Sequence, residues 1–246
     1  MTMRDLLVRG MLAGVLAGIL ATGFGFVVGE PAIERAIALE EQAAEAAPHT
    51  HGVSGLPDEA PPVSRGIQRS LGLVTGLVVL GVAFGGAHAV LFAFARGRLG
   101  LTSDRGTALV VAVLTFIAFN LVPFLKYPAN PPAVGHAETI AARTAAYVGM
   151  LAISVLLMVA AVLLQRMLTM TRSAWDASLL AGAGFVVLVA VTSLLLPVFA
   201  EVPETFPADV LWQFRLASLG AQLTLWLGIG IVFGILVDRA ASQPRA

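Results

Sequence analysis

Residues 71–95 read LGLVTGLVVLGVAFGGAHAVLFAFA, and His88 is the only side chain among them that can ionise. An α-helix rises about 1.5 Å per residue, so about 20 apolar residues cross the roughly 30 Å hydrocarbon core of a bilayer. A helix that is apolar on every side belongs in the core of a large protein or in lipid. The stretch therefore predicts a transmembrane helix.

Five further stretches have the same length and character, which gives predicted spans at residues 6–29, 71–95, 107–125, 145–164, 179–199 and 210–237. The chain is 58% hydrophobic and 12% charged, whereas a soluble domain is about 25% charged. Its mean hydropathy is +0.88. We expect an all-α integral membrane protein, a polytopic bundle of about six helices in one transmembrane domain over residues 1–246, with five helices as the alternative. Residues 6–29 are too long for a typical secretory signal and lack a clear cleavage site at their exit, so we expect an anchor.

The arginines predict the orientation, because cytoplasmic loops carry an excess of basic residues. An N-in/C-in arrangement in the cytoplasmic (inner) membrane puts nine of the fifteen basic residues inside. These nine are Arg4, Arg9, Arg96, Arg98, Arg105, Arg166, Arg172, Arg239 and Arg245.

Composition excludes several classes of function. The absence of cysteine excludes thiolate metal sites and cysteine nucleophiles. Lys126 is the only lysine and does not follow a glycine run, so the chain has no ATPase site of its own. The net charge of zero gives no reason to expect a nucleic-acid partner. No Ser-His-Asp constellation or HExxH motif indicates an enzyme.

The outer segment at residues 30–70 is acidic and contains a His-x-His motif. Glu30, Glu34, Glu41 and Glu45 lie within about 60° of one another if the first helix continues, at about 100° per residue. In the extended chain expected after them, His49 and His51 point the same way. Carboxylates with imidazoles suit divalent first-row cations such as Co²⁺, Ni²⁺ or Zn²⁺. The alternative is a solvated acidic face followed by a linker.

Polar residues inside the predicted spans are candidates for a transport path. An ionisable group at the depth of His88 is a functional hypothesis by default, with a neutral histidine bonded across a helix contact as the alternative. Arg215, Ser218 and Gln222 share one face of the last span. Because a fixed positive charge is a poor lining for a cation path, we interpret Arg215 as a clamp or gate, or as an anchor that reaches to the interface.

Asn120 and Pro123 lie near the end of the third span. The missing N–H of Pro123 frees a carbonyl one turn earlier, which in a membrane needs another partner or a water-filled cavity. A kink is therefore expected, with a substrate site beside Asn120 as a further hypothesis.

Glycines recur at a spacing of four residues, which lets helix backbones approach closely in lipid. We expect them to build helix contacts. The pairs and triplets are Gly10, Gly14 and Gly18, Gly25 and Gly29, Gly72 and Gly76, Gly81 and Gly85, and Gly230 and Gly234.

Three stretches resemble one known family along nearly the whole chain. They are the acidic segment from Glu30-Pro31 to His49-Thr50-His51, residues 121–135 (LVPFLKYPANPPAVG) and residues 214–222 (FRLASLGAQ). The chain resembles the CbtA-type cobalt transporter subunits, and residues 121–135 are the most specific part. The resemblance implies a membrane component that imports cobalt for cobalamin-dependent metabolism, with a small one-helix, histidine-bearing CbtB subunit as partner. That family is commonly described with five membrane helices, whereas six are predicted here.

We therefore expect a permease subunit that imports a divalent cation, with cobalt favoured over nickel or zinc as transported ion and no permanently bound cofactor. His49, His51 and the four outer glutamates would collect the ion. His88, Asn120, Arg215 and Gln222 would line its path. A non-transporting membrane scaffold or assembly protein is the first alternative, and a membrane enzyme acting on a lipid-linked substrate is the second. Besides the CbtB-like subunit and the bilayer, a second copy of the chain is an alternative partner.

Overall fold

The computed structural model describes residues 1–46, 64–100, 103–132 and 134–242. Within these ranges the chain is helical and contains no strand. Six helices are long and apolar enough to cross a membrane: Met3–Gln42, Arg65–Ala95, Asp104–Lys126, Ala137–Leu168, Ala174–Leu195 and Ala208–Ala241. The predicted all-α bundle of six spans is confirmed, and the five-helix alternative is not needed.

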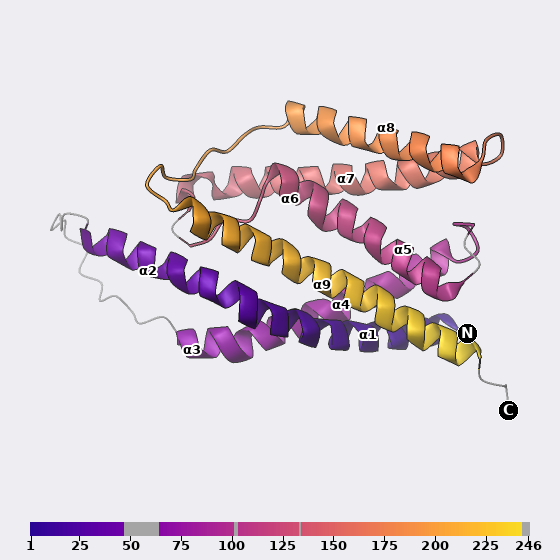
Figure 1. Ribbon diagram of the computed structural model, residues 1–246, viewed down its shortest axis with the longest axis horizontal. Helices are drawn as coiled ribbons and strands as arrows, with labels where there is room; N and C mark the ends of the chain where they lie inside the picture. Colours follow the sequence, from indigo (N-terminus) through magenta and orange to yellow (C-terminus); the bar gives the residue numbers. More distant parts are fainter. Residues whose placement is uncertain (47–63, 101–102, 133, 243–246) are drawn as a thin grey trace.

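Three of the spans contain a π-helical turn (Figure 1). The first consists of α1 (Met3–Phe24), η1 (Gly25–Gly29) and α2 (Glu30–Ala46). The second consists of α3 (Arg65–Ile67), η2 (Gln68–Gly72) and α4 (Leu73–Ala95), and the third of α5 (Asp104–Phe116), η3 (Ile117–Leu121) and α6 (Val122–Lys126). A short helix η4 (Ala137–Thr139) leads into α7 (Ile140–Leu168), which is followed by α8 (Ala174–Leu195) and α9 (Ala208–Ala241).

Hydroxyl side chains start three of the helices. Thr2 and Asp5 form a capping box at α1, in which each side chain bonds the other residue's backbone N–H. The Ser103 side chain accepts from the backbone at the start of α5, and Ser173 does the same at α8. Such caps satisfy backbone donors that have no partner inside the helix.

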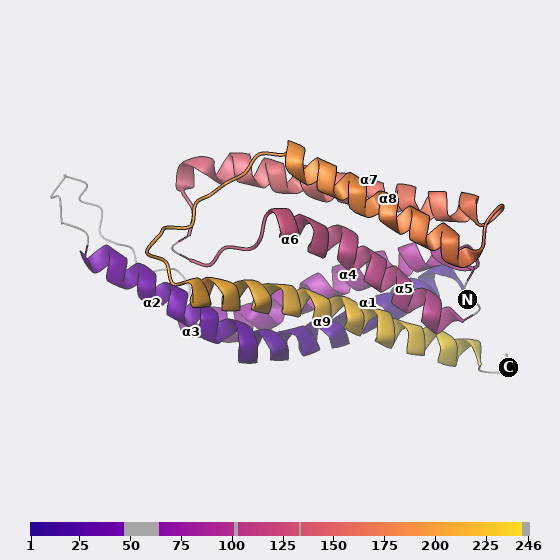
Figure 2. The ribbon, with the colours of Figure 1, turned by 45° about the horizontal axis from the view of Figure 1, so that its top comes forward.

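The first and the last helix meet at one end of the bundle. The start of α1 and the end of α9 lie together in Figures 1 and 2, as an even number of crossings requires. We call the opposite end the outer end, following the predicted orientation, which stays a prediction. The first span runs from residue 3 to 46, about 66 Å of helix, so α2 extends well beyond a core of about 30 Å.

The closest contact in the bundle is between the backbones of α1 and α4. A Cβ added to Gly14 would lie 1.9 Å from the carbonyl oxygen of Gly81, and one on Gly85 would lie 2.1 Å from that of Gly10. On Gly18 it would meet the Leu77 carbonyl at 2.7 Å. Only glycine fits this antiparallel contact, so the predicted packing role is confirmed for these positions.

Helix α9 uses small residues in the same way and packs between α1 and α5 (Figure 1). A Cβ on Gly230 would lie 2.6 Å from that of Ala112, and one on Gly228 would lie 2.9 Å from that of Ala17. The packing role is wrong for Gly29 and Gly76, because a Cβ there would meet nothing within 4 Å. Spacing alone does not tell which glycines face another helix.

Helices α7 and α8 form a separate layer over α5 and α6 (Figure 2). They pack on each other, and Met150 and Ser154 of α7 and Ala177 and Ala181 of α8 are buried. Large apolar side chains cover much of the rest, as expected of a lipid-facing surface. The hairpin is therefore the least buried part of the bundle.

The turn η3 ends at Leu121, two residues before Pro123. The backbone N–H of Val122 bonds the Ile117 carbonyl, five residues back. Because Pro123 has no N–H to offer, the helix widens locally instead of keeping the regular ladder. This turn carries Asn120.

The glycine contact yields a test with a control in the same helix. We expect Gly14→Ala to lower the apparent Tm of the purified protein in detergent, because overpacking a tight contact costs about 1–3 kcal/mol. Gly23→Ala should keep or raise the Tm, since a Cβ at Gly23 meets nothing within 4 Å and alanine is the better helix former. Equal Tm values for both variants would contradict the backbone contact.

Candidate functional site

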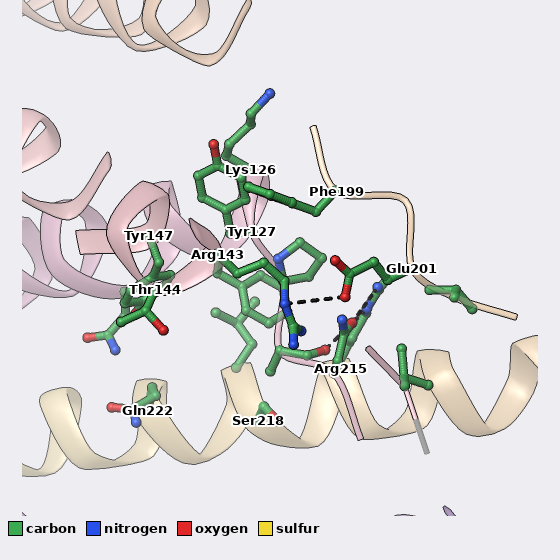
Figure 3. Close-up of a pocket in the computed structure, with 18 of the residues that line it drawn as sticks. Lys126, Tyr127, Arg143, Thr144, Tyr147, Phe199, Glu201, Arg215, Ser218 and Gln222 are labelled. Carbon is green, nitrogen blue, oxygen red and sulfur yellow. Dashed lines mark hydrogen bonds and ion pairs between the residues drawn. The ribbon is translucent and has the colours of Figure 1, made fainter. Parts of the chain in front are cut away.

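A polar cavity of ≈ 590 Å³ lies at the outer end of the bundle, between α6, α7, α9 and the segments that join them (Figure 3). Its volume lies in the range of small-molecule sites, about 300–1,000 Å³. The polar residues on its wall are Asn120, Lys126, Tyr127, Asn130, Arg143, Thr144, Tyr147, Glu201, Arg215, Ser218 and Gln222.

The structure brings together three of the four residues predicted for a transport path. Asn120, Arg215 and Gln222 all line the cavity, together with Ser218 of the same α9 face. Arg215, Ser218 and Gln222 are spaced by three and four residues and therefore share one face of α9. This face lies towards α6 and α7, which form other walls of the cavity. His88 does not line this cavity.

Arg215 holds the proline-rich segment after α6 against α9. Its Nε donates to the Ala129 carbonyl at 3.3 Å, and its Nη2 donates to the Asn130 Oδ1 at 3.0 Å. Both acceptors are neutral, and among the described residues Arg215 has no carboxylate within 4.0 Å. The guanidinium therefore keeps its full charge at the cavity wall.

Glu201 closes the opposite side of the cavity. Its Oε2 accepts from the His136 backbone N–H at 2.9 Å and lies 3.3 Å from the Arg143 Nε. Arg143 also donates to the His136 carbonyl at 3.1 Å. Gly135 has φ +115°, a backbone conformation that favours glycine, and a Cβ on it would lie 2.6 Å from the Arg143 guanidinium and displace that side chain.

The surroundings of Glu201 favour its ionised form. The neighbouring Thr139 hydroxyl, the hydrogen bond from the His136 backbone and the positive charge of Arg143 lower the pKa of Glu201 below its ordinary value of 4.5. The carboxylate is ionised at neutral pH and neutralises Arg143.

The inner end of the cavity is closed by aromatic side chains. The Trp226 Nε1 donates to the Asn120 Oδ1 at 2.6 Å, and the Phe84 ring stacks on Trp226 with a centroid distance of 5.0 Å. Beside them, the buried carbonyl oxygen of Gln222 has no hydrogen-bond partner among the described residues. A buried acceptor of this kind is costly unless a ligand or water fills the site.

His88 lies apart from the cavity, in the core between α4 and α9. It is fully buried, and neither ring nitrogen has a partner among the described residues. Its ring meets that of Phe233 edge to face at 5.1 Å. A place for His88 on an ion path stays a prediction, and it requires α4 and α9 to separate.

Two of the four outer glutamates that were predicted as metal ligands form ion pairs with arginines. Glu30 bonds Arg65 at 2.6 Å, and Glu34 pairs with Arg69, so two of the four carboxylates are neutralised by the start of the second span. Glu41 and Glu45 are exposed on α2. His49 and His51 lie outside the described residues, and within those residues no group of three or more His, Asp or Glu can hold a metal ion.

Charge determines what the cavity can bind. Lys126, Arg143 and Arg215 stand against Glu201 alone, a surplus of two positive charges. A divalent ion about 6 Å from one unpaired guanidinium meets a repulsion of roughly 5 kcal/mol at an effective dielectric constant of about 20. The described wall is thus better suited to an anionic group than to a bare cation.

Sequence reasoning did not select Lys126, Tyr127, Arg143, Tyr147 or Glu201 for this site. Arg143 and Glu201 are far apart in the chain, and only the paths of the two outer segments bring them together. The sequence signal that could have found part of this site is the stretch at residues 121–135, the most specific part of the family resemblance. It supplies Lys126, Tyr127 and Asn130 to the cavity wall.

Comparison with known proteins gives one match. A family model described as "Probable cobalt transporter subunit (CbtA)" matches residues 3–238. No curated protein and no solved structure matches the chain. The matched region runs from the first span to the last and includes every residue of the cavity.

Because the pKa of Glu201 is lowered on folding, its contribution to stability is present above 4.5 and is lost as pH falls through the folded-state value. We expect the apparent Tm to fall on acidification below 4.5 in the wild type. The fall should be shallower in Glu201→Gln, which starts from a lower Tm at neutral pH. Glu204→Gln changes an exposed glutamate of the same segment and serves as control. A Glu201→Gln curve parallel to that of the wild type would contradict the ion pair.

Proposed function

Because this chain belongs to the CbtA family of probable cobalt transporter subunits, we propose that it is the membrane-spanning subunit of a permease that imports cobalt through the cytoplasmic membrane. The observation that carries the proposal is the polar cavity at the outer end of the six-helix bundle. Asn120, Arg215 and Gln222 contribute to it from two helices, α9 and the span that contains η3. In this proposal the cavity is the first chamber on the way in, although its positively charged wall repels a bare cation.

The outer segment would collect the metal before it reaches the cavity. Glu41, Glu45, His49 and His51 supply carboxylate and imidazole ligands that suit a divalent first-row cation. The Glu30 and Glu34 ion pairs with Arg65 and Arg69 support this arrangement, because they fasten α2 to the start of the second span. The start of α2 is thereby held against the bundle, and its exposed end with Glu41 and Glu45 projects beyond the other helices (Figure 1).

The membrane potential is sufficient to drive import. A divalent ion that moves inwards gains about 4.6 kcal/mol at 100 mV. That free energy supports an uphill gradient of roughly a thousandfold, at 1.4 kcal/mol per tenfold. A permease of this kind needs no nucleotide site, in agreement with the sequence, whose only lysine does not follow a glycine run.

A transporter subunit implies partner subunits, and we propose a single-helix, CbtB-like chain as the partner. An apolar crevice of ≈ 530 Å³ between α5, α7 and α8 supports this. Ser178, Ala181 and Gly182 lie on its wall, and small residues let another helix approach closely in lipid. A second copy of the chain would meet the same surface.

The scaffold hypothesis is the second candidate, and a specific observation favours it. The Trp226–Asn120 bond and the complete burial of His88 leave no polar path between α4 and α9 below the cavity, in the part of the chain that the structure describes. An assembly protein needs no path through this region. A transporter needs a second conformation.

Radiolabelled cobalt uptake by cells that express the chain, with and without a single-helix partner, separates these candidates. We expect uptake above background, with a several-fold reduction in His49→Ala/His51→Ala at matched membrane levels. His88→Leu should reduce uptake as well, because it removes the one ionisable group in the inner half of α4.

His136→Ala is the matched control, since it removes the fourth histidine of the chain while the backbone bonds of that residue to Glu201 and Arg143 remain. Uptake that survives in both His49→Ala/His51→Ala and His88→Leu would keep the transporter and remove the assigned ligands. No uptake under any condition would favour the scaffold.

A further inference from the structure

The charge of the cavity bears on the form in which cobalt arrives. Arg143 is neutralised by Glu201, whose Oε2 also accepts from the His136 backbone N–H, while its Oε1 has no hydrogen-bond partner among the described residues. Arg215 has only neutral acceptors among the described residues. The cavity wall therefore contains one guanidinium with no carboxylate partner among the described residues.

Arg215 also has donors to spare. A guanidinium carries more N–H groups than its bonds to Ala129 and Asn130 use. In Figure 3 the Arg215 side chain reaches towards Arg143 and Glu201, whereas the Lys126 ammonium points away from them. The planar guanidinium is suited to hold a carboxylate, which accepts two parallel N–H bonds.

Arg215 offers hydrogen-bond donors to a ligand, whereas Gln222, two helical turns further in, needs a donor from it. Its buried carbonyl oxygen has no partner among the described residues and needs a donor. A hydroxyl group, or a water molecule bound to a metal, provides one. The hydroxyls of Ser218 and Thr144 lie on the same wall.

We propose that the cavity docks cobalt as an anionic complex of a small hydroxycarboxylate, with Arg215 on a ligand carboxylate and Gln222 on a hydroxyl or metal-bound water, rather than as the bare Co²⁺ ion. This inference rests on the proposed function for the identity of the metal. The membrane potential opposes inward movement of a net negative complex, so the ligand stays at the outer side while the metal passes on.

The binding of citrate tests this without transport and without metal. The full chain is purified into nanodiscs of phosphatidylcholine, and radiolabelled citrate is titrated by equilibrium dialysis, first alone and then with equimolar Co²⁺. We expect saturable binding in both cases. Arg215→Gln should weaken it by at least about tenfold, the effect of losing one charged hydrogen bond, and Arg215→Lys should restore part of the affinity. Arg172→Gln removes one positive charge from the exposed α7–α8 turn and should change nothing.

A second variant keeps the test valid if loss of the Arg215 contacts unfolds the protein. Gln222→Leu breaks no hydrogen bond of the buried carbonyl and removes an unsatisfied acceptor. It should fold, yet bind citrate several-fold more weakly. Undiminished binding in Gln222→Leu and in a folded Arg215→Gln would overturn the proposal, as would no citrate binding to the wild type.

An anionic lipid headgroup offers the same chemistry to Arg215. Nanodiscs of phosphatidylglycerol distinguish the two sources: displacement of citrate by this lipid would overturn the proposal, and persistent binding supports a soluble anion. Cobalt uptake in cells decides the proposed function separately. Uptake without citrate binding contradicts only this inference, and citrate binding without uptake contradicts only the cobalt permease.

Discussion

The close contact between the backbones of α1 and α4 is the constraint on which the rest of the bundle depends. Gly14 and Gly81 leave no room for a side chain between the two helices, and the hydrophobic effect does not drive helices together inside lipid. The pair presents Ala17 and Ala21 to α9, which packs there through Gly228. Helix α9 is then fixed between α1 and α5, and its polar face turns towards α6 and α7. The cavity is thus a consequence of where small residues stand in the sequence.

The sequence predicts the spans well because the bilayer makes length and apolarity sufficient signals. The shared face of Arg215, Ser218 and Gln222 on α9 is equally predictable, since helical spacing alone puts the three on one side. The ion pairs were not predicted. Glu30 finds Arg65 only because the first helix continues past the membrane and the chain then returns beside it.

The cavity shows the same limit. The Arg143–Glu201 pair depends on two outer segments whose paths no periodicity encodes. The burial of His88 depends on Phe233 of the last helix. In both cases local pattern identifies the polar residue but not its surroundings, which are set by tertiary contacts far along the chain.

The outer end of the bundle contains two regions of opposite charge: the exposed glutamates of α2 carry negative charge, whereas the cavity wall carries a surplus of positive charge. Below the cavity, Trp226 bonds Asn120 and stacks on Phe84. If the cavity opens inwards as proposed, α9 must move relative to η3, because the Trp226–Asn120 bond joins these two elements. The tightly packed α1–α4 pair is poorly suited to supply that movement. The α7–α8 layer is better suited, because few of its side chains are buried and it meets the rest of the bundle mainly through η3 and α6. A displacement of this layer would act directly on the cavity, because Arg143, Thr144 and Tyr147 of α7 form one of its walls.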